Sequence, residues 1–289
     1  MLLDPEMRDR LDRLSMTTGA RIRSSYTGRH LSKHLGESLD FADYREYVAG
    51  DDYRRIDHQL WARLGQVLIR RYEAEEELTV TVILDATASM GMAEKFSTAK
   101  QLAAIVSYLA LSSGDRVVPV VVAGEGGRST TRGPVGRHRS AWPAIERWLE
   151  AVEPGGSVPL AGAIRGVVGP IAGKGSVVVV SDLLDAEWER VLDGAGLGTG
   201  GVVAHVLAPE ELEPTLVGDV RLVDVETGAE VEASTSPEML EAYAVAVERF
   251  VSDAAGRSRR VGLDHVLVPA GDDAGERFLR KMAVAEVLK

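Results

Sequence analysis

The segment Val80-Thr81-Val82-Ile83-Leu84-Asp85-Ala86-Thr87-Ala88-Ser89-Met90-Gly91 has the strongest local pattern in this chain. Its first five residues are β-branched or apolar without a break, which is typical of a parallel strand buried on both faces. The strand is expected to end at Asp85, and open parallel sheets bind ligands at the carboxyl ends of their strands. Asp85, Thr87 and Ser89 place hard oxygens on one side of a tight loop, and such oxygens suit Mg²⁺ or Mn²⁺.

Apolar runs and helical patterns alternate on the carboxyl side of this segment. Strands are expected at residues 117–122, 177–180, 202–207 and 265–268, and helices at residues 95–113, 140–151, 160–171, 186–195, 237–255 and from 274. Hairpins are expected at residues 124–136 and around residues 220–232. Strands that alternate with helices predict an α/β fold with a doubly wound, mainly parallel sheet.

The amino-terminal part has a different character. Residues 4–18 show the spacing of a short amphipathic helix, and residues 21–40 resemble an arm, since residues 8–34 hold seven Arg or Lys and two acids. Residues 41–78 interleave charges with aromatic side chains, and we expect this segment to pack on the core. The expected division is therefore an N-terminal helix and basic arm over 1–40, this segment over 41–78, and the α/β domain over 79–289.

Composition excludes several classes of function. The 289 residues include no cysteine, so disulfides, zinc–thiolate sites and cysteine nucleophiles are ruled out. A formal net charge of −11 disfavours general nucleic-acid binding, and residues 208–253 alone hold twelve acids against two arginines. We find no apolar run of membrane-spanning length and no signal peptide, and therefore expect a cytoplasmic protein without a membrane span.

A second expected strand also ends in an acid, in Ser181-Asp182, and the loop of residues 154–160 carries one hydroxyl residue just before a helix. Central strands of a doubly wound sheet end beside one another. These oxygens are therefore expected to meet around one Mg²⁺ (or Mn²⁺), with the candidate ligands Asp85, Thr87, Ser89, Ser157 and Asp182. In the simpler interpretation, Ser157 and Asp182 only cap the helices that follow them.

This constellation resembles the metal-ion-dependent adhesion site of von Willebrand factor A domains, with its pattern Asp-x-Ser-x-Ser, then Thr, then Asp. Asp85, Thr87 and Ser89 match the first part, with Thr in place of the middle Ser, and Asp182 matches the last acid. Ser157 stands for the family's Thr with one extra residue in the loop. The resemblance implies a von Willebrand factor A fold and a docking site completed by an acidic side chain from a protein partner.

The upstream segment resembles the signature of the bacterial family called domain of unknown function 58. The matching residues are Phe41-Ala42-Asp43-Tyr44-Arg45-Glu46-Tyr47-Val48-Ala49-Gly50-Asp51-Asp52-Tyr53-Arg54-Arg55-Ile56-Asp57, Ala62-Arg63 and Gly28-Arg29-His30-x-Ser32. His58 stands where that family typically has Trp. The resemblance implies a non-enzymatic accessory of a MoxR-type AAA+ ATPase in chaperone-like assembly. We favour a structural role for the signature, in which it packs the arm against the sheet. In the competing interpretation it is a second docking surface, and Arg54 and Arg55 are the candidate partner-binding residues.

An enzyme remains the alternative hypothesis. A haloacid-dehalogenase-like phosphatase also places a magnesium-binding Asp at the end of a strand, and Asp85 would then be its nucleophile. In that scheme Lys174 neutralises phosphate, and Asp182 with Asp185 holds magnesium. The upstream signature has no place in such an enzyme, so we favour the binding module.

Overall fold

The computed structural model describes residues 1–14, 41–48, 51, 53–72, 79–124, 129–173, 175–198, 200–214, 218–225 and 228–284. The chain divides into a larger unit, residues 1–24 and 78–289, and a smaller unit, residues 25–77.

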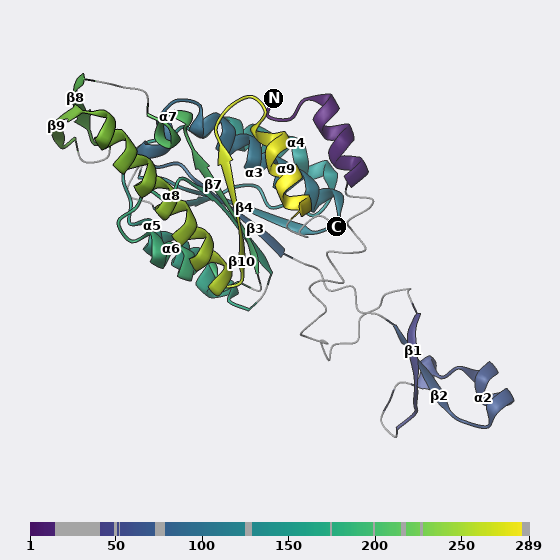
Figure 1. The fold of residues 1–289 in the computed structure, drawn as a ribbon. Helices are drawn as coiled ribbons and strands as arrows, with labels where there is room; N and C mark the ends of the chain where they lie inside the picture. The colour runs from purple at the N-terminus through teal and green to yellow at the C-terminus, as the bar shows by residue number, and fades with distance from the viewer. Residues whose placement is uncertain are drawn as a thin grey trace. The chain divides into compact units, whose positions relative to one another are not determined.

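A six-stranded sheet in the order β10-β7-β6-β3-β4-β5 forms the centre of the larger unit (Figure 1). Its members are β3 (Thr79–Asp85), β4 (Arg116–Val122), β5 (Thr130–Arg132), β6 (Ser176–Ser181), β7 (Gly201–Leu207) and β10 (Leu263–Pro269). All neighbours are parallel except β5, which runs antiparallel to β4. The expected α/β class with a mainly parallel sheet is therefore confirmed.

The order of the strands reverses at β3. The chain moves from β3 to β4 on one side, and later adds β6, β7 and β10 on the other side. In register, Leu84 of β3 lies opposite Val121 of β4 and Val180 of β6. The carboxyl ends of β3 and β6 are thus neighbours at the point of reversal, where doubly wound sheets bind their ligands.

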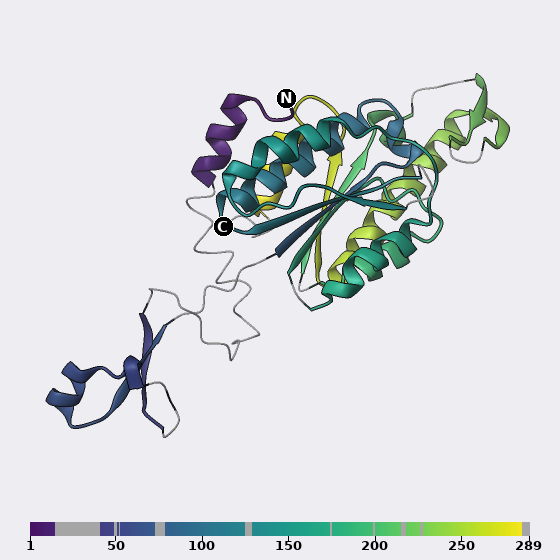
Figure 2. The same ribbon diagram turned by 180° about the vertical axis from the view of Figure 1, so that it is seen from behind.

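Helices cover both faces of the sheet (Figures 1 and 2). One face carries α3 (Lys95–Ser112), α4 (Trp142–Glu150) and α9 (Ala274–Val284), and the other carries α5 (Leu160–Val168), α6 (Trp188–Ala195) and α8 (Pro237–Arg260). Alternate residues of β3 serve the two layers, since Val82 and Leu84 join the first core and Ile83 the second. This double burial explains why the strand reads as an unbroken apolar run.

The remaining elements refine the expected boundaries. A helix over residues 5–14 packs its Leu11 into the first core, whereas the last residues of the expected helix (15–18) and the expected arm (21–40) lie outside the described residues. Helix α8 continues to Arg260, beyond the expected end at 255, and Gly262 with φ +79° follows it. The expected hairpin near residue 220 is β8 (Gly218–Val223) with β9 (Glu230–Thr235), a sheet of its own. The short α7 (Pro209–Leu212) was not predicted.

The smaller unit contains an antiparallel pair, β1 (Phe41–Glu46) and β2 (Leu68–Tyr72), with α2 (His58–Leu64) between them. Asp57 caps α2 by accepting hydrogen bonds from the backbone N–H groups of Gln59 and Leu60 at 3.0 and 3.1 Å. Its second carboxylate oxygen accepts a hydrogen bond from the Tyr44 hydroxyl. Part of the signature therefore has a local structural role, while its packing on the core stays a prediction.

None of the helices in the described ranges is long and apolar enough to cross a membrane.

Candidate metal site

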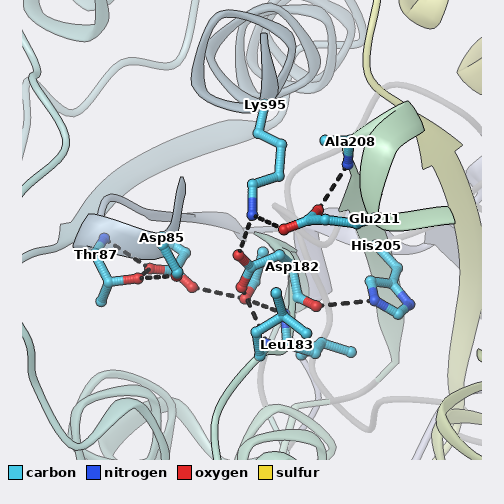
Figure 3. A network of polar contacts seen from close by, with 11 residues as sticks. Asp85, Thr87, Lys95, Asp182, Leu183, His205, Ala208 and Glu211 are labelled. Carbon is cyan, nitrogen blue, oxygen red and sulfur yellow. Dashed lines mark hydrogen bonds and ion pairs between the residues drawn. The ribbon is translucent and has the colours of Figure 1, made fainter. Parts of the chain in front are cut away.

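The three residues predicted at the end of β3 converge in the structure, and Figure 3 shows Asp85 hydrogen-bonded to Thr87. Oδ1 of Asp85 accepts hydrogen bonds from the backbone N–H of Thr87 at 3.0 Å and from its hydroxyl at 2.8 Å. The hydroxyl oxygens of Thr87 and Ser89 lie 3.1 Å apart. All three side chains are buried. The spacing of two residues thus gathers their oxygens in one small space, as the sequence predicted.

Ser181 joins this loop to the neighbouring strand. The Ser181 hydroxyl donates to Oδ2 of Asp85 at 2.7 Å. The oxygen of this hydroxyl accepts a hydrogen bond from the backbone N–H of Leu183 at 3.0 Å. Both oxygens of Asp85 are therefore hydrogen-bonded from opposite sides. From the sequence, Ser181 was considered only as the residue before Asp182. A hydroxyl residue at a strand end, followed by Asp182 and Asp185, could have indicated that Ser181 contributes to the site.

Asp182 forms an ion pair with Lys95, a residue that was not predicted from the sequence to belong to the site. Its Oδ1 accepts the backbone N–H of Leu184 at 3.1 Å, and its Oδ2 lies 2.8 Å from Nζ of Lys95 at the start of α3 (Figure 3). The same ammonium group lies 2.7 Å from Oε1 of Glu211 in α7. The second Glu211 oxygen accepts the backbone N–H of Ala208. Lys95 and Glu211 thus extend the site beyond the predicted residues.

Two histidines form a hydrogen-bonded chain that ends at the backbone carbonyl of Asp182. Nε2 of His205 lies 2.9 Å from the carbonyl oxygen of Asp182, which can only accept, so this nitrogen carries the hydrogen. Nδ1 of His205 then accepts from Nε2 of His265 at 3.0 Å. Burial lowers the pKa of His205 to about 3 and that of His265 to about 4. Both rings are therefore neutral near pH 7.

The charges of the site do not balance. Burial, reinforced by the nearby charge of Asp182, raises the pKa of Asp85 to about 6, although hydrogen bonds from Ser181 and Thr87 oppose the shift. Among the described residues no cationic side chain pairs with Asp85, whereas Asp182 and Glu211 share Lys95. With every group ionised, three carboxylates face one ammonium group, which leaves a net charge of −2 in a poorly solvated place. A divalent cation would neutralise that charge.

The loop of Ser157 lies against the Asp85 loop. The backbone N–H of Ala88 donates to the carbonyl of Gly156 at 2.9 Å, and that of Gly155 donates to the carbonyl of Ala86 at 2.8 Å. Gly156 has φ +70°, and a Cβ there would meet Cα of Gly124 at 2.7 Å. Glycine is therefore required where this loop passes the backbone of Gly124, which follows β4. The Ser157 residue, which follows directly, is exposed.

Neither helix-capping interpretation holds. Pro159 occupies the N-cap position of α5 without a side-chain hydrogen bond, and the first N–H of the helix, at Leu160, donates to Asp185 instead. Glu187 occupies the N-cap position of α6, five residues beyond Asp182. Asp182 instead uses one oxygen for the turn at Leu184 and the other for Lys95.

Strained backbone follows both halves of the site. Ala93 and Leu183 adopt positive φ values of 46° and 55°, which side-chain-bearing residues rarely do. Leu183 is fully buried directly after Asp182. Residues in such conformations cost of order 1 kcal/mol or more each and cluster at functional sites. Their position supports a functional role for these two loops.

The donor set fits a hard cation bound by carboxylate, hydroxyl and water. Among the described residues there is no group of three or more His, Cys, Asp or Glu side chains suited to hold a metal ion. A cation here would thus depend on the two strand-end carboxylates, on the hydroxyls of Thr87 and Ser89, and on water. Mg²⁺ commonly retains several waters in protein sites of this kind.

The other predicted residues lie in different places. Arg54 is exposed in the smaller unit, 6.0 Å from the ring centroid of Tyr53, and belongs to the 3₁₀ helix η1 (Tyr53–Arg55). Nothing is described of the Arg55 side chain, and Lys174 lies outside the described residues.

The fold and site define an α/β protein with an acidic, hydroxyl-rich site at a strand switch point. A family model described as "Protein of unknown function DUF58" matches residues 43–251. The chain belongs to this family.

Two mycobacterial relatives of this chain are described as uncharacterised proteins. The chain is 28% identical over 267 residues to the uncharacterised proteins Rv1480 of Mycobacterium tuberculosis and Mb1516 of Mycobacterium bovis, covering 90% of this chain and 83% of each relative. A solved structure of the pilus adhesin SpaC from Lactobacillus rhamnosus GG matches with a TM-score of 0.36 and 9% identity, over 74% of this chain and 30% of the adhesin.

Proposed function

We propose that this protein is a metal-dependent protein-interaction module with a von Willebrand factor A-like fold. In this proposal one Mg²⁺ (or Mn²⁺) binds between Asp85, Thr87, Ser89 and Asp182, with Ser157 as a further ligand. The observation that carries the proposal is the convergence of the Asp85, Thr87 and Ser89 oxygens at the end of β3, close to the charge of Asp182, with Asp85 left without a counter-charge among the described residues. The cation would supply that counter-charge and an open coordination position.

Docking of a protein partner is supported by apolar side chains beside the site. Met92 and Leu184 are 44% and 49% exposed, and the backbone N–H of each is hydrogen-bonded to a site residue, Ser89 and Asp182 respectively. Exposed apolar groups around a polar centre are common in protein interfaces. An acidic side chain of the partner would complete the metal shell. By resemblance to its family, that partner is a MoxR-type AAA+ ATPase, and the assembly is chaperone-like.

A binding role accounts for Asp85 better than a catalytic one. The residue is 1% exposed, and both of its carboxylate oxygens accept hydrogen bonds, which leaves less room for in-line attack on a substrate phosphoryl group than for a small cation. Asp185, a magnesium ligand in the phosphatase alternative, accepts backbone hydrogen bonds from Leu160 and Glu187. A magnesium-dependent assay with p-nitrophenyl phosphate tests that alternative. Turnover that disappears in Asp85→Asn would replace the binding module by an enzyme.

The interaction itself is tested by a pull-down of a purified MoxR-type ATPase on the immobilised full chain, with Mg²⁺ and with EDTA. We expect capture in Mg²⁺, loss in EDTA, and loss in Asp85→Ala with circular dichroism unchanged. Capture that is equal in Mg²⁺ and EDTA contradicts a metal-bridged contact. In the same assay Arg54→Glu examines the smaller unit as a second docking surface, because this exposed side chain can change charge without disturbing a core.

A further inference from the structure

Lys95 is buried more completely than lysine normally is. Its side chain is 0% exposed, and its ammonium group lies between the carboxylates of Asp182 and Glu211 at 2.8 and 2.7 Å. Lysine is almost never fully buried unless it is paired. A buried ion pair is often no more stabilising than apolar side chains of similar size. Stability alone is therefore a weak reason for a lysine at this position.

The position of Lys95 bears directly on the metal. Its ammonium group occupies Oδ2 of Asp182, while the Leu184 N–H occupies Oδ1. Each Asp182 oxygen therefore has one lone pair already in use, and a cation bound to Oδ2 would lie close to the ammonium group, whereas a cation reached through water would lie further from it. A fixed positive charge beside the site also repels an incoming cation.

We propose that Lys95 is an internal cation that weakens metal binding, so that the metal is held firmly only when a partner contributes its carboxylate. This inference rests on the proposed metal site and adds its regulation. Lys95 does not contact the metal. It changes metal affinity by positioning the Asp182 carboxylate and by its own positive charge, and is therefore a positioning residue. Metal loading and partner docking then become coupled, because the partner's negative charge offsets the positive charge of Lys95.

Glu211 has the opposite effect in this scheme. It shares the ammonium group with Asp182 and offsets part of its charge, and the hydroxyl of Tyr243 in α8 donates to its backbone carbonyl at 2.9 Å. Removing the charge of Glu211 leaves the ammonium group less compensated. Substitutions at the two positions should therefore change metal affinity in opposite directions, whereas residues needed only for folding would change it in the same direction.

The test is a calorimetric titration of the full chain with MgCl₂ and MnCl₂. We expect Lys95→Met to bind about tenfold more tightly than wild type, Glu211→Gln to bind more weakly, and the double variant to lie near wild type. Lys100→Met is the matched control, since this lysine lies on the same helix and contacts backbone carbonyls of Glu150 and Val152. Its affinity should equal that of wild type.

Thermal unfolding in EDTA and in Mg²⁺ gives a second readout. Lys95→Met should melt lower than wild type in EDTA and gain more from Mg²⁺, and Lys95→Gln replaces it if the methionine variant does not fold. If wild type binds the metal and the folded Lys95 variants bind it no more tightly, the proposed role of Lys95 is wrong. The proposed metal site is then unaffected. Binding in Lys95→Met alone supports the inference. Absence of binding in every folded variant overturns both.

Discussion

Nζ of Lys95 lies 2.8 Å from Oδ2 of Asp182, and solvent reaches almost nothing of either side chain. Asp182 therefore has a permanent counter-charge, while the neighbouring Asp85 has hydrogen bonds alone among the described residues. This asymmetry assigns different parts to the two acids. In the proposed metal site, Asp85 is the carboxylate whose charge the cation would neutralise, and Asp182 is its neighbour held in place by Lys95.

Asp85 should destabilise the metal-free protein at neutral pH. Its pKa is raised to about 6, so the folded state binds more protons than the unfolded state between about pH 4 and 6, and stability falls as pH rises through that range. Asp85→Asn should raise the free energy of unfolding in EDTA at pH 7.5 by up to about 3 kcal/mol. Urea denaturation measures this gain, which should shrink towards pH 4. If Asp85→Asn is less stable than wild type at pH 7.5, the ionised Asp85 carboxylate does not destabilise the metal-free protein.

Ser181 should stabilise the site through its hydroxyl. Ser181→Ala leaves Oδ2 of Asp85 and the N–H of Leu183 without this partner, and buried groups that lose a partner cost about 1–3 kcal/mol. Ser107→Ala is the control, because the equally buried Ser107 hydroxyl has no hydrogen-bond partner among the described residues. Denaturation midpoints should fall for the first variant and hold or rise for the second. Equal effects would remove the special role of Ser181.

Gly156 should be essential for the shape of the site, whereas the neighbouring Gly155 should not be. Gly156→Ala forces a Cβ towards Gly124 at φ +70°, whereas a Cβ at Gly155 meets nothing within 4 Å. Because the Gly156 carbonyl accepts the N–H of Ala88, displacement of this loop should disturb the Asp85 loop. We expect Gly156→Ala to lose at least about 1 kcal/mol of stability and to bind Mg²⁺ more weakly. Similar behaviour of Gly155→Ala would refute this explanation.

The two histidines should make the fold sensitive to acid. The pKa values of His205 and His265 are lowered to about 3 and 4, so the unfolded state takes up protons first as pH falls below about 6.5. Their contribution to stability is present above that pH and is lost progressively towards pH 4. His205→Gln keeps a donor for the Asp182 carbonyl and should reduce this loss, measured as melting temperature against pH. The exposed His138→Gln should behave as wild type.

Local sequence pattern was enough to predict the first half of the site. Strand β3 is buried on both faces and reads as an apolar run, and the alternation of Asp85, Thr87 and Ser89 places their oxygens together whatever the rest of the chain does. The neighbouring position of Asp182 also followed, because parallel strands end at the same edge.

The second half depended on packing between distant residues. Lys95 and Glu211 are 116 positions apart, one at the start of a helix and one in an acid-rich stretch, and no local pattern pairs them. Only the packing of α3 against the end of β7 brings them together and excludes water. The helix-capping interpretation of Ser157 failed for a similar reason, since Asp185 reaches the start of α5 from another loop.

The most direct measurement is a calorimetric titration of the metal-free full chain with MgCl₂ and MnCl₂, carried out on wild type and on Asp85→Ala. We predict one cation per chain for wild type and no binding for Asp85→Ala, with circular dichroism confirming that the variant is folded. A folded Asp85→Ala that binds the cation as tightly as wild type, or the absence of binding in both the folded wild type and folded Lys95→Met, would contradict the proposed metal site.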